Sequence, residues 1–289
     1  MSSMLAHNQT PTSRHAGPRH RPAIYRHSGL VRIGHWINVL CMTVLLMSGL
    51  QIFNAHPALY WGQRSTFDDP LFAIDAKRAA SGAMIGVTTL FGHAFETTGM
   101  LGLSTDGDGN TEARGFPAWA TVPGPEWLAM GRRWHFFFAW VFVINGVVYA
   151  LFALLSGHLW RDLMPTRRDL AHIGRSISDH LRFRFPETER YNVLQKIAYL
   201  IVAFGLGPLI ILTGLTMSPR IDAGFPVLLD IFGGRQSART LHFICAFSFL
   251  AFVLLHLFMV VVSGVWNNLR SMVTGRYVIE DGGEGHGKD

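Results

Sequence analysis

Cysteine is scarce in this sequence. Only two of its 289 residues are cysteine, Cys41 and Cys245, and both fall inside long apolar runs. Two thiols make neither a disulfide framework nor a cysteine cluster that could hold a metal. The C-x-x-C-H motif is absent as well, which excludes a haem held by thioether bonds.

The sequence also lacks the glycine-rich loop with an acidic partner that binds dinucleotides, and it has no hydrolase motif. Chemistry on a final substrate is therefore expected to belong to another subunit. No apolar run of signal-peptide kind precedes the first long apolar segment. Residues 1–30 are polar and rich in Arg, His, Ser and Pro, and we expect a disordered cytoplasmic tail that is not cleaved.

Apolar side chains are abundant. They make up 49% of the residues, against 15% charged residues, and eight tryptophans are present. This composition is typical of a polytopic membrane protein rather than of a soluble domain. The net charge of +6 then requires no nucleic acid as a partner, because excess Lys and Arg in membrane proteins sets the orientation and binds anionic headgroups.

Four apolar runs without Asp or Glu are long enough to cross the bilayer as helices, since about 20 residues span its hydrocarbon core. We therefore predict an all-α membrane protein whose main domain, residues 31–264, is a four-transmembrane-helix bundle. The predicted spans are residues 33–53, 134–158, 197–218 and 241–262. Gly205, Gly207 and Pro208 predict a kink in the third span.

The connections between the spans differ in length and character. Residues 54–133 are rich in Gly, Pro, Asp and Thr, and we predict that their middle, residues 79–95, is a helix on or near the membrane. A connection this long is a candidate surface for docking a partner, and the alternative is an insert without a role. In the second connection, residues 182–191 alternate arginines with aromatic residues, as expected at a headgroup surface. Residues 265–289 are predicted to be a second cytoplasmic tail.

Two histidines lie in the fourth span. His242 and His256 are fourteen residues apart, which is about 21 Å along a helix and about 40° from a whole number of turns. Both imidazoles therefore face one side of the helix, near opposite leaflets. Histidine is costly in lipid and marks functional sites there, and imidazole is a common axial ligand of haem iron. The alternative is that both histidines hydrogen-bond neighbouring helices.

The distribution of Lys and Arg predicts how the four spans are oriented in the membrane, and this orientation predicts which histidines lie at the same depth. Five arginines precede the first span and eight Lys or Arg lie in the second connection, against six in the long first connection and three in the third. By the positive-inside tendency, both termini and the second connection face the cytoplasm. His35 then lies at the depth of His256, near the inner face, and His135 at the depth of His242, near the outer face. Two such pairs predict a bundle binding two six-coordinate b-type haems.

Arginines precede three of these histidines in the sequence: Arg32, Arg132, Arg133 and Arg239. Guanidinium groups bind carboxylates strongly, and haem propionates lie at the membrane edge, so these side chains are candidate propionate partners. The alternative is that they are ordinary arginines at span ends that extend to the headgroups.

The segments RIGHWIN, RRWHFFF, RYNVLQK and ARTLHF, with a second histidine fourteen residues after the last, resemble the prokaryotic cytochrome b561 superfamily. It includes the b-type cytochrome subunit of nickel-iron hydrogenases, the gamma subunit of formate dehydrogenase and the anchors of thiosulfate reductase. The resemblance implies two haem b groups that pass electrons between the quinone pool and a catalytic oxidoreductase subunit, a molybdopterin enzyme or a hydrogenase. We accordingly expect a multi-pass protein of the bacterial inner membrane whose partner docks on the outer, periplasmic face.

The same resemblance implies a quinone site beside the inner haem. Asn192 matches the position that contacts quinone in the formate dehydrogenase gamma subunit, and Gln195 follows it. Val193 and Leu194 depart from that pattern because they are bulky. The alternative is that Asn192 caps the third helix, which its side chain also suits.

A histidine-bearing membrane transporter or metal-ion channel without haem is the alternative function. Such a protein normally has an internal repeat and acidic residues within the membrane, and neither is evident in the four runs. Cytochromes that carry both ligand pairs on two helices are disfavoured, since the residues fourteen positions after His35 and His135 are Gly49 and Tyr149.

Overall fold

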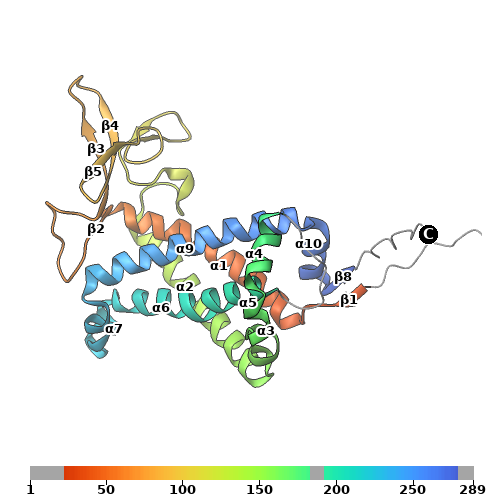
Figure 1. Cartoon of the computed structure of the whole chain (residues 1–289). Helices are drawn as coiled ribbons and strands as arrows, with labels where there is room; N and C mark the ends of the chain where they lie inside the picture. Colours follow the sequence, from red (N-terminus) through yellow and green to blue (C-terminus); the bar gives the residue numbers. More distant parts are fainter. Residues whose placement is uncertain (1–22, 183–191, 279–289) are drawn as a thin grey trace, which may run out of the picture.

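The computed structural model describes residues 23–182 and 192–278. Four long helices dominate it (Figure 1): α1 (Gly29–Asn54), α2 (Leu128–Leu155), a composite third helix (Val193–Thr216) and α9 (Arg235–Val262). Each is long and apolar enough to cross a membrane. The helices begin four to six residues before the predicted apolar runs. In α1, α2 and α9 the added first turns contain arginines, whose long side chains can reach the headgroups, and in the third helix they contain Lys196, which pairs with Asp169.

The third helix is built from three segments. α5 (Val193–Leu200) leads into the π-helical segment η3 (Ile201–Leu206), and α6 (Gly207–Thr216) follows with Pro208 in its first turn. Proline has no backbone N–H to donate into the preceding turn, so the regular α-helical hydrogen-bond pattern is interrupted there. A π-helical stretch therefore lies where the glycines and Pro208 predicted a kink, and the kink itself stays a prediction.

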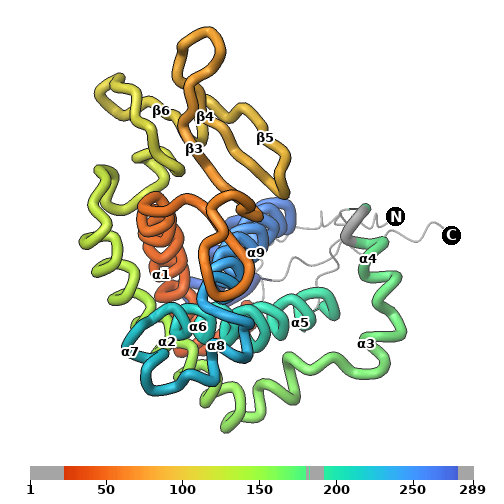
Figure 2. Tube along the Cα trace, turned by 90° about the vertical axis from the view of Figure 1, so that its left-hand side faces the viewer, coloured from red at the N-terminus to blue at the C-terminus, as the bar shows by residue number. Residues whose placement is uncertain are grey.

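The four helices run side by side as two antiparallel pairs (Figure 1, Figure 2). α1 packs along α2, and α6 packs along α9. We call the end of the bundle that contains Asn54, Leu128, Thr216 and Arg235 the sheet end, and the opposite end the tail end. Large apolar side chains such as Leu155, which is 85% exposed, cover the outer surface of the helices, as expected where they face lipid.

The connection between α1 and α2, residues 55–127, is called the insert below, and it contains an antiparallel sheet. The strands, in spatial order, are β2 (Ala58–Leu59), β3 (Phe72–Arg78), β4 (Met84–Leu90) and β5 (His93–Glu96). The prediction of a helix over residues 79–95 is therefore wrong, and the all-α class holds for the membrane part alone. Two signals favour strands here: β-branched residues in β4, and a two-residue turn at Phe91 and Gly92, both with positive φ.

Shorter elements complete the insert: β6 (Ser104–Thr105), β7 (Thr111–Glu112) and the 3-10 helix η1 (Ala118–Ala120). An apolar core fastens the insert to the helices. The buried members of this core are Phe53, Leu59, Ile74 and Phe116, and Phe243 and Phe247 of α9 pack against them. The sheet consequently stands on the ends of α1 and α9, as Figure 1 shows.

Arg114 provides a second attachment of the insert. It is 5% exposed and donates from Nη2 to Oε1 of Gln51 at 2.9 Å and from Nη1 to the carbonyl of Gly124 at 2.9 Å. Gln51 in turn donates to the carbonyl of Pro125 at 2.9 Å. The guanidinium therefore connects the last turn of α1 with the segment that enters α2.

Short helices form the other connections: η2 (Leu159–Leu163), α3 (Arg167–Ala171), α4 (Ile173–Leu181), α7 (Pro219–Gly224) and α8 (Val227–Phe232). The backbone N–H of Thr166 and the Lys196 ammonium, 2.9 Å away, lower the pKa of the Asp169 carboxyl to about 2. This ion pair attaches α3 to the start of α5. The predicted headgroup-binding alternation falls mostly on residues 183–191, which lie outside the described residues.

Three elements form the tail end: β1 (Ala23–Tyr25), α10 (Val265–Thr274) and β8 (Arg276–Val278). The two strands pair in an antiparallel manner. The disordered tail predicted for residues 1–30 is thus wrong for residues 23–30, which form β1 and lead into α1. Residues 1–22 and 279–289, the rest of the two predicted tails, lie outside the described residues.

Candidate functional site

The four predicted ligand histidines lie in two pairs, one toward each end of the bundle. At the tail end, the ring centres of His35 on α1 and His256 on α9 are 6.3 Å apart. At the sheet end, the ring centres of His135 on α2 and His242 on α9 are 6.2 Å apart. Each histidine pair therefore connects the α1–α2 pair with α9 of the other helix pair.

These separations suit one metal between two imidazoles. Imidazoles that bind an iron from opposite sides, each through a metal–nitrogen bond of about 2 Å, have ring centres about 6 Å apart. No group of three or more His, Cys, Asp or Glu side chains that could hold a metal occurs within residues 23–182 and 192–278. The geometry thus fits the axial ligands of a haem better than a zinc or copper ion that takes all its ligands from the protein.

At the sheet end, the second ring nitrogen of each histidine is hydrogen-bonded. Nδ1 of His135 lies 3.1 Å from Oγ of Ser48 on α1. Nδ1 of His242 lies 3.0 Å from the carbonyl oxygen of Ile210 and 3.2 Å from Oγ1 of Thr213, both on α6. Because a carbonyl only accepts, Nδ1 of His242 carries the proton, and Nε2 has the free lone pair that a metal needs.

Two glycines lie against these rings. A Cβ atom on Gly49 of α1 would lie 3.4 Å from Cε1 of His135, and one on Gly214 of α6 would lie 3.2 Å from Cε1 of His242. Glycine inside a helix costs roughly 0.5 to 1 kcal/mol relative to alanine. At Gly214 the missing side chain lets α6 approach the histidine closely, whereas a Cβ atom on Gly49 would make an ordinary van der Waals contact.

The tail-end pair has different surroundings. Nδ1 of His35 is buried and has no hydrogen-bond partner among the described residues. The ring of Trp36 meets that of His35 edge-on at 5.3 Å, and Nε1 of Trp36 donates to the carbonyl of Met272 at 3.2 Å. Phe252 stacks on His256 with ring centres 5.9 Å apart. The two candidate sites are therefore not equivalent.

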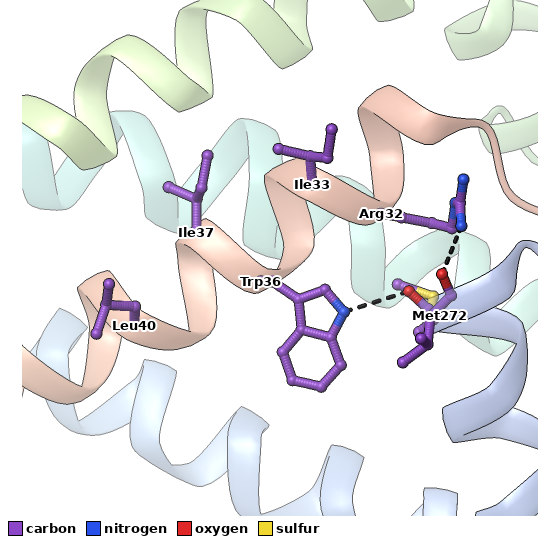
Figure 3. Close-up of a pocket in the computed structure, with 7 residues that line it drawn as sticks. Arg32, Ile33, Trp36, Ile37, Leu40 and Met272 are labelled. Atoms are coloured by element: carbon purple, nitrogen blue, oxygen red, sulfur yellow. Dashed lines mark hydrogen bonds between the residues drawn. The ribbon is translucent and has the colours of Figure 1, made fainter.

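An open cavity of about 520 Å³ lies beside the first turns of α1. Its lining residues, shown in Figure 3, are Arg32, Ile33, Trp36, Ile37, Leu40, Met272 and Val273. Arg32 donates from Nη1 to the carbonyl of Val273, and Trp36 donates to that of Met272, so α10 is tied to α1 at the cavity rim. The mostly apolar lining suits the hydrocarbon part of a ligand.

The four arginines predicted to bind propionates differ in their contacts. Arg32 is bonded to α10, as described above. Nη2 of Arg239 donates to the carbonyl of His56 at 2.5 Å and so attaches α9 to the insert. Arg132 and Arg133 are exposed at the start of α2. None of these contacts tests the assignment to propionates, which stays a prediction.

Asn192 and Gln195 form a capping box at the start of α5. Oδ1 of Asn192 accepts the backbone N–H of Leu194 at 3.1 Å, and Oε1 of Gln195 accepts the backbone N–H of Asn192 at 3.1 Å. The helix cap that the sequence left as an alternative is therefore present. Contact of these two residues with a quinone stays a prediction.

Sequence reasoning missed the residues that surround the sheet-end histidines. A signal was present, because Ser48–Gly49 and Thr213–Gly214 each place a hydroxyl residue before a glycine within an apolar run. Its meaning depends on which helix packs against which, and that pairing is a property of the fold.

Comparison with known proteins identifies the class of the chain. A family model described as prokaryotic cytochrome b561 matches residues 26–275. The chain is also 27% identical over 251 residues to a protein of Azospira oryzae described as putative protein-methionine-sulfoxide reductase subunit YedZ1. That match covers 86% of this chain and 96% of the relative. No solved structure matches the chain.

Proposed function

Because the chain belongs to the prokaryotic cytochrome b561 family, we propose that it binds two haems and carries electrons across the membrane between the quinone pool and a catalytic oxidoreductase subunit. The family and the four apolar helices make it a membrane b-type cytochrome subunit for electron transfer, and the family implies haem b. Family membership argues against the alternative of a transporter or channel without haem.

Two histidine pairs at different depths support this function. Their ring centres are 6.3 and 6.2 Å apart, and the pairs lie toward opposite ends of helices that could cross a membrane. His242 and His256, one from each pair, are about 21 Å apart along α9. Haem b bound at each pair would supply one-electron iron chemistry. The four histidines would hold the two groups one above the other, an arrangement that suits transfer across a bilayer.

We place the partner subunit at the sheet end. The insert extends beyond the helix ends there and exposes large aromatic side chains, such as Phe91 at 70% and Trp119 at 78% exposure. Exposed apolar side chains of this kind often mark interaction surfaces. The description of the relative as a reductase subunit supports an oxidoreductase as the partner. The distribution of Lys and Arg supports an inner-membrane orientation with the sheet end outside and both termini in the cytoplasm.

We place quinone exchange at the tail end. The cavity between α1 and α10 is open, and its apolar walls suit the isoprenoid chain of a quinone. Nε of Arg32, which is buried and has no hydrogen-bond partner in the described part of the chain, is a donor suited to a quinone carbonyl. Asn192 and Gln195, at the start of α5, are a second candidate surface at this end.

Oxidation of a quinol tests this function. The purified protein is reconstituted in lipid vesicles, oxidised and mixed with a short-chain quinol, and the haem absorbance is followed. We expect the quinol to reduce the haem faster than it does in vesicles with the haem supplied free. Full reduction by dithionite without measurable reduction by quinol would remove the quinone pool from the proposal and leave the cytochrome assignment intact.

Replacing Asn192 with serine is expected to slow the reduction of haem by quinol. Serine keeps an N-cap but shortens the reach toward a ligand, so the optical spectrum and the thermal stability should stay nearly unchanged. Stopped-flow absorbance on the variant gives the rate. If Asn192→Ser reacts at the wild-type rate, Asn192 is not at the quinone site, and Arg32→Gln, at the cavity, becomes the variant expected to be slow.

A further inference from the structure

Two dipeptides repeat the same arrangement at the sheet end. Ser48–Gly49 on α1 contacts His135 of α2, and Thr213–Gly214 on α6 contacts His242 of α9. In both cases the hydroxyl lies within hydrogen-bond distance of Nδ1, at 3.1 and 3.2 Å, and the glycine lies against the same ring. The two contacts involve four different helical segments, so one local packing interaction does not explain both.

Both hydroxyls act as acceptors toward the imidazoles. Oγ of Ser48 donates its hydrogen to the carbonyl of Val44 at 2.6 Å, and Oγ1 of Thr213 donates to the carbonyl of Leu209 at 2.8 Å. A hydroxyl has one hydrogen, so each of these oxygens is placed to accept the hydrogen of an Nδ1–H group, which at His242 is shared with the carbonyl of Ile210 at 3.0 Å. The resulting chains, N–H to hydroxyl to carbonyl, leave Nε2 of each ring free to bind a metal.

The two hydroxyls at the sheet-end pair are buried. Ser48 and Thr213 are both fully buried, at 0% exposure, so water does not compete for these hydrogen bonds. At the tail end, Nδ1 of His35 is also buried but has no hydrogen-bond partner among the residues that the structure describes. His35 therefore lacks the hydrogen bond from Nδ1 that both sheet-end histidines make.

We propose that Ser48 and Thr213 are positioning residues that lower the reduction potential of the haem held by His135 and His242. An imidazole that donates a hydrogen bond from Nδ1 is a more basic ligand at Nε2, and a more basic axial ligand stabilises oxidised iron. This inference rests on the proposed function, since it requires a haem at this pair. A lower reduction potential of the sheet-end haem would favour electron transfer from this haem to a partner subunit docked at the sheet end.

A role in helix packing alone is the alternative explanation for the two hydroxyls, and the experiment must distinguish it from an effect on the reduction potential. Ser and Thr in helices commonly bond the carbonyl four residues earlier, and Thr216 does so with Leu212 at 2.8 Å. If Ser48 and Thr213 have only that role, removing their hydroxyls changes stability but leaves the reduction potential unchanged.

Redox potentiometry on the purified protein, followed by haem absorbance and by electron paramagnetic resonance of the oxidised low-spin signals, tests the proposal. Ser48→Ala and Thr213→Val remove the hydroxyls, whereas Ser48→Thr and Thr213→Ser keep them. Thr216→Ala is the matched control, because this buried hydroxyl bonds Leu212. We expect Ser48→Ala to shift the sheet-end component toward the reduced form by about tenfold, or about 59 mV for one electron. Thr213→Val should shift it in the same direction by less, because Nδ1 of His242 keeps the carbonyl of Ile210 as an acceptor. The tail-end component and the other three variants should keep wild-type potentials.

Unchanged potentials in Ser48→Ala and Thr213→Val at full haem content would overturn the proposal. Equal shifts in Ser48→Thr and Thr213→Ser would overturn it as well, because the hydroxyl would then not be the cause. Loss of the sheet-end haem from the variants without a hydroxyl, with no shifted potential in either of them, would overturn it too, because the hydroxyls would then stabilise the site and not set its potential. A wild-type protein that binds no haem would instead contradict the proposed function, which is a distinguishable result.

Discussion

Replacing His242 with alanine is expected to remove the haem at the sheet end and to leave the haem at the tail end in place. His242 and His135 would be the two axial ligands of one iron, and an iron with imidazole on one side only is not a six-coordinate centre. In a potentiometric titration of the purified variant, one of the two redox components should disappear, and the haem content per chain should fall by about half. His256→Ala should remove the other component.

The remaining two ligand variants test the pairing itself. His135→Ala should lose the same component as His242→Ala, and His35→Ala the same component as His256→Ala. His93→Ala is the matched control, because His93 is exposed on the edge strand β5, and this variant should keep both components. Loss of one and the same component from His35→Ala and His135→Ala, in variants that reach the membrane in wild-type amounts, would contradict the pairing.

Replacing Arg114 with alanine is expected to loosen the insert from the end of the bundle. The buried guanidinium donates to Gln51, to Thr121 and to the carbonyl of Gly124. Its loss removes the donor to Oε1 of Gln51 and leaves the carbonyl of Gly124 with only the longer bond from Thr121, at 3.3 Å. Leaving a buried acceptor without its donor costs roughly 1 to 3 kcal/mol. Limited proteolysis of the purified variant should therefore cleave within residues 55–127 much faster than in the wild-type protein, as measured by mass spectrometry of the fragments.

Arg78→Ala is the control for this experiment. Arg78 lies at the exposed end of β3 and donates only within its own hairpin, to the carbonyl of Gly82 at 3.0 Å. Its loss should leave the cleavage rate near that of the wild-type protein. Wild-type resistance of Arg114→Ala would show that the apolar core around Phe53 holds the insert without help from the guanidinium.

The histidine pairs could be predicted from the sequence because they depend on local geometry. The rise of an α-helix converts the fourteen residues between His242 and His256 into a depth difference, and the direction of each span then sets the depth of His35 and His135. The structure brings the histidines together in the predicted combination. Their role as ligands remains the proposal that the experiments above address.

The insert could not be predicted in this way because strand pairing is non-local. Residues 79–95 are a short apolar stretch, and periodicity does not distinguish a short helix from a strand there. β4 is a strand because β3, earlier in the chain, pairs with it over seven residues, from Phe72 opposite Leu90 to Arg78 opposite Met84. The turn that ends β4 places Phe91 at a positive φ, which is uncommon for a residue other than glycine.

The residues around the sheet-end histidines could not be predicted from the sequence for a related reason. Ser48 and Thr213 read as ordinary polar residues in apolar helices, and each becomes informative only beside an imidazole of a neighbouring helix. The cap at Asn192 shows the opposite case. A capping box involves residues three positions apart, so the sequence was sufficient to recognise it as an alternative.

The central claim, two haems held by four histidines, is tested most directly by counting haem in the purified protein. A pyridine haemochrome assay gives the haem type and amount, and a dithionite-reduced minus oxidised spectrum shows whether the iron is low-spin and six-coordinate. The account predicts b-type haem at two per chain, because four suitably placed imidazoles fill four axial positions. A fully loaded protein with a single haem per chain, or one without haem, would contradict it.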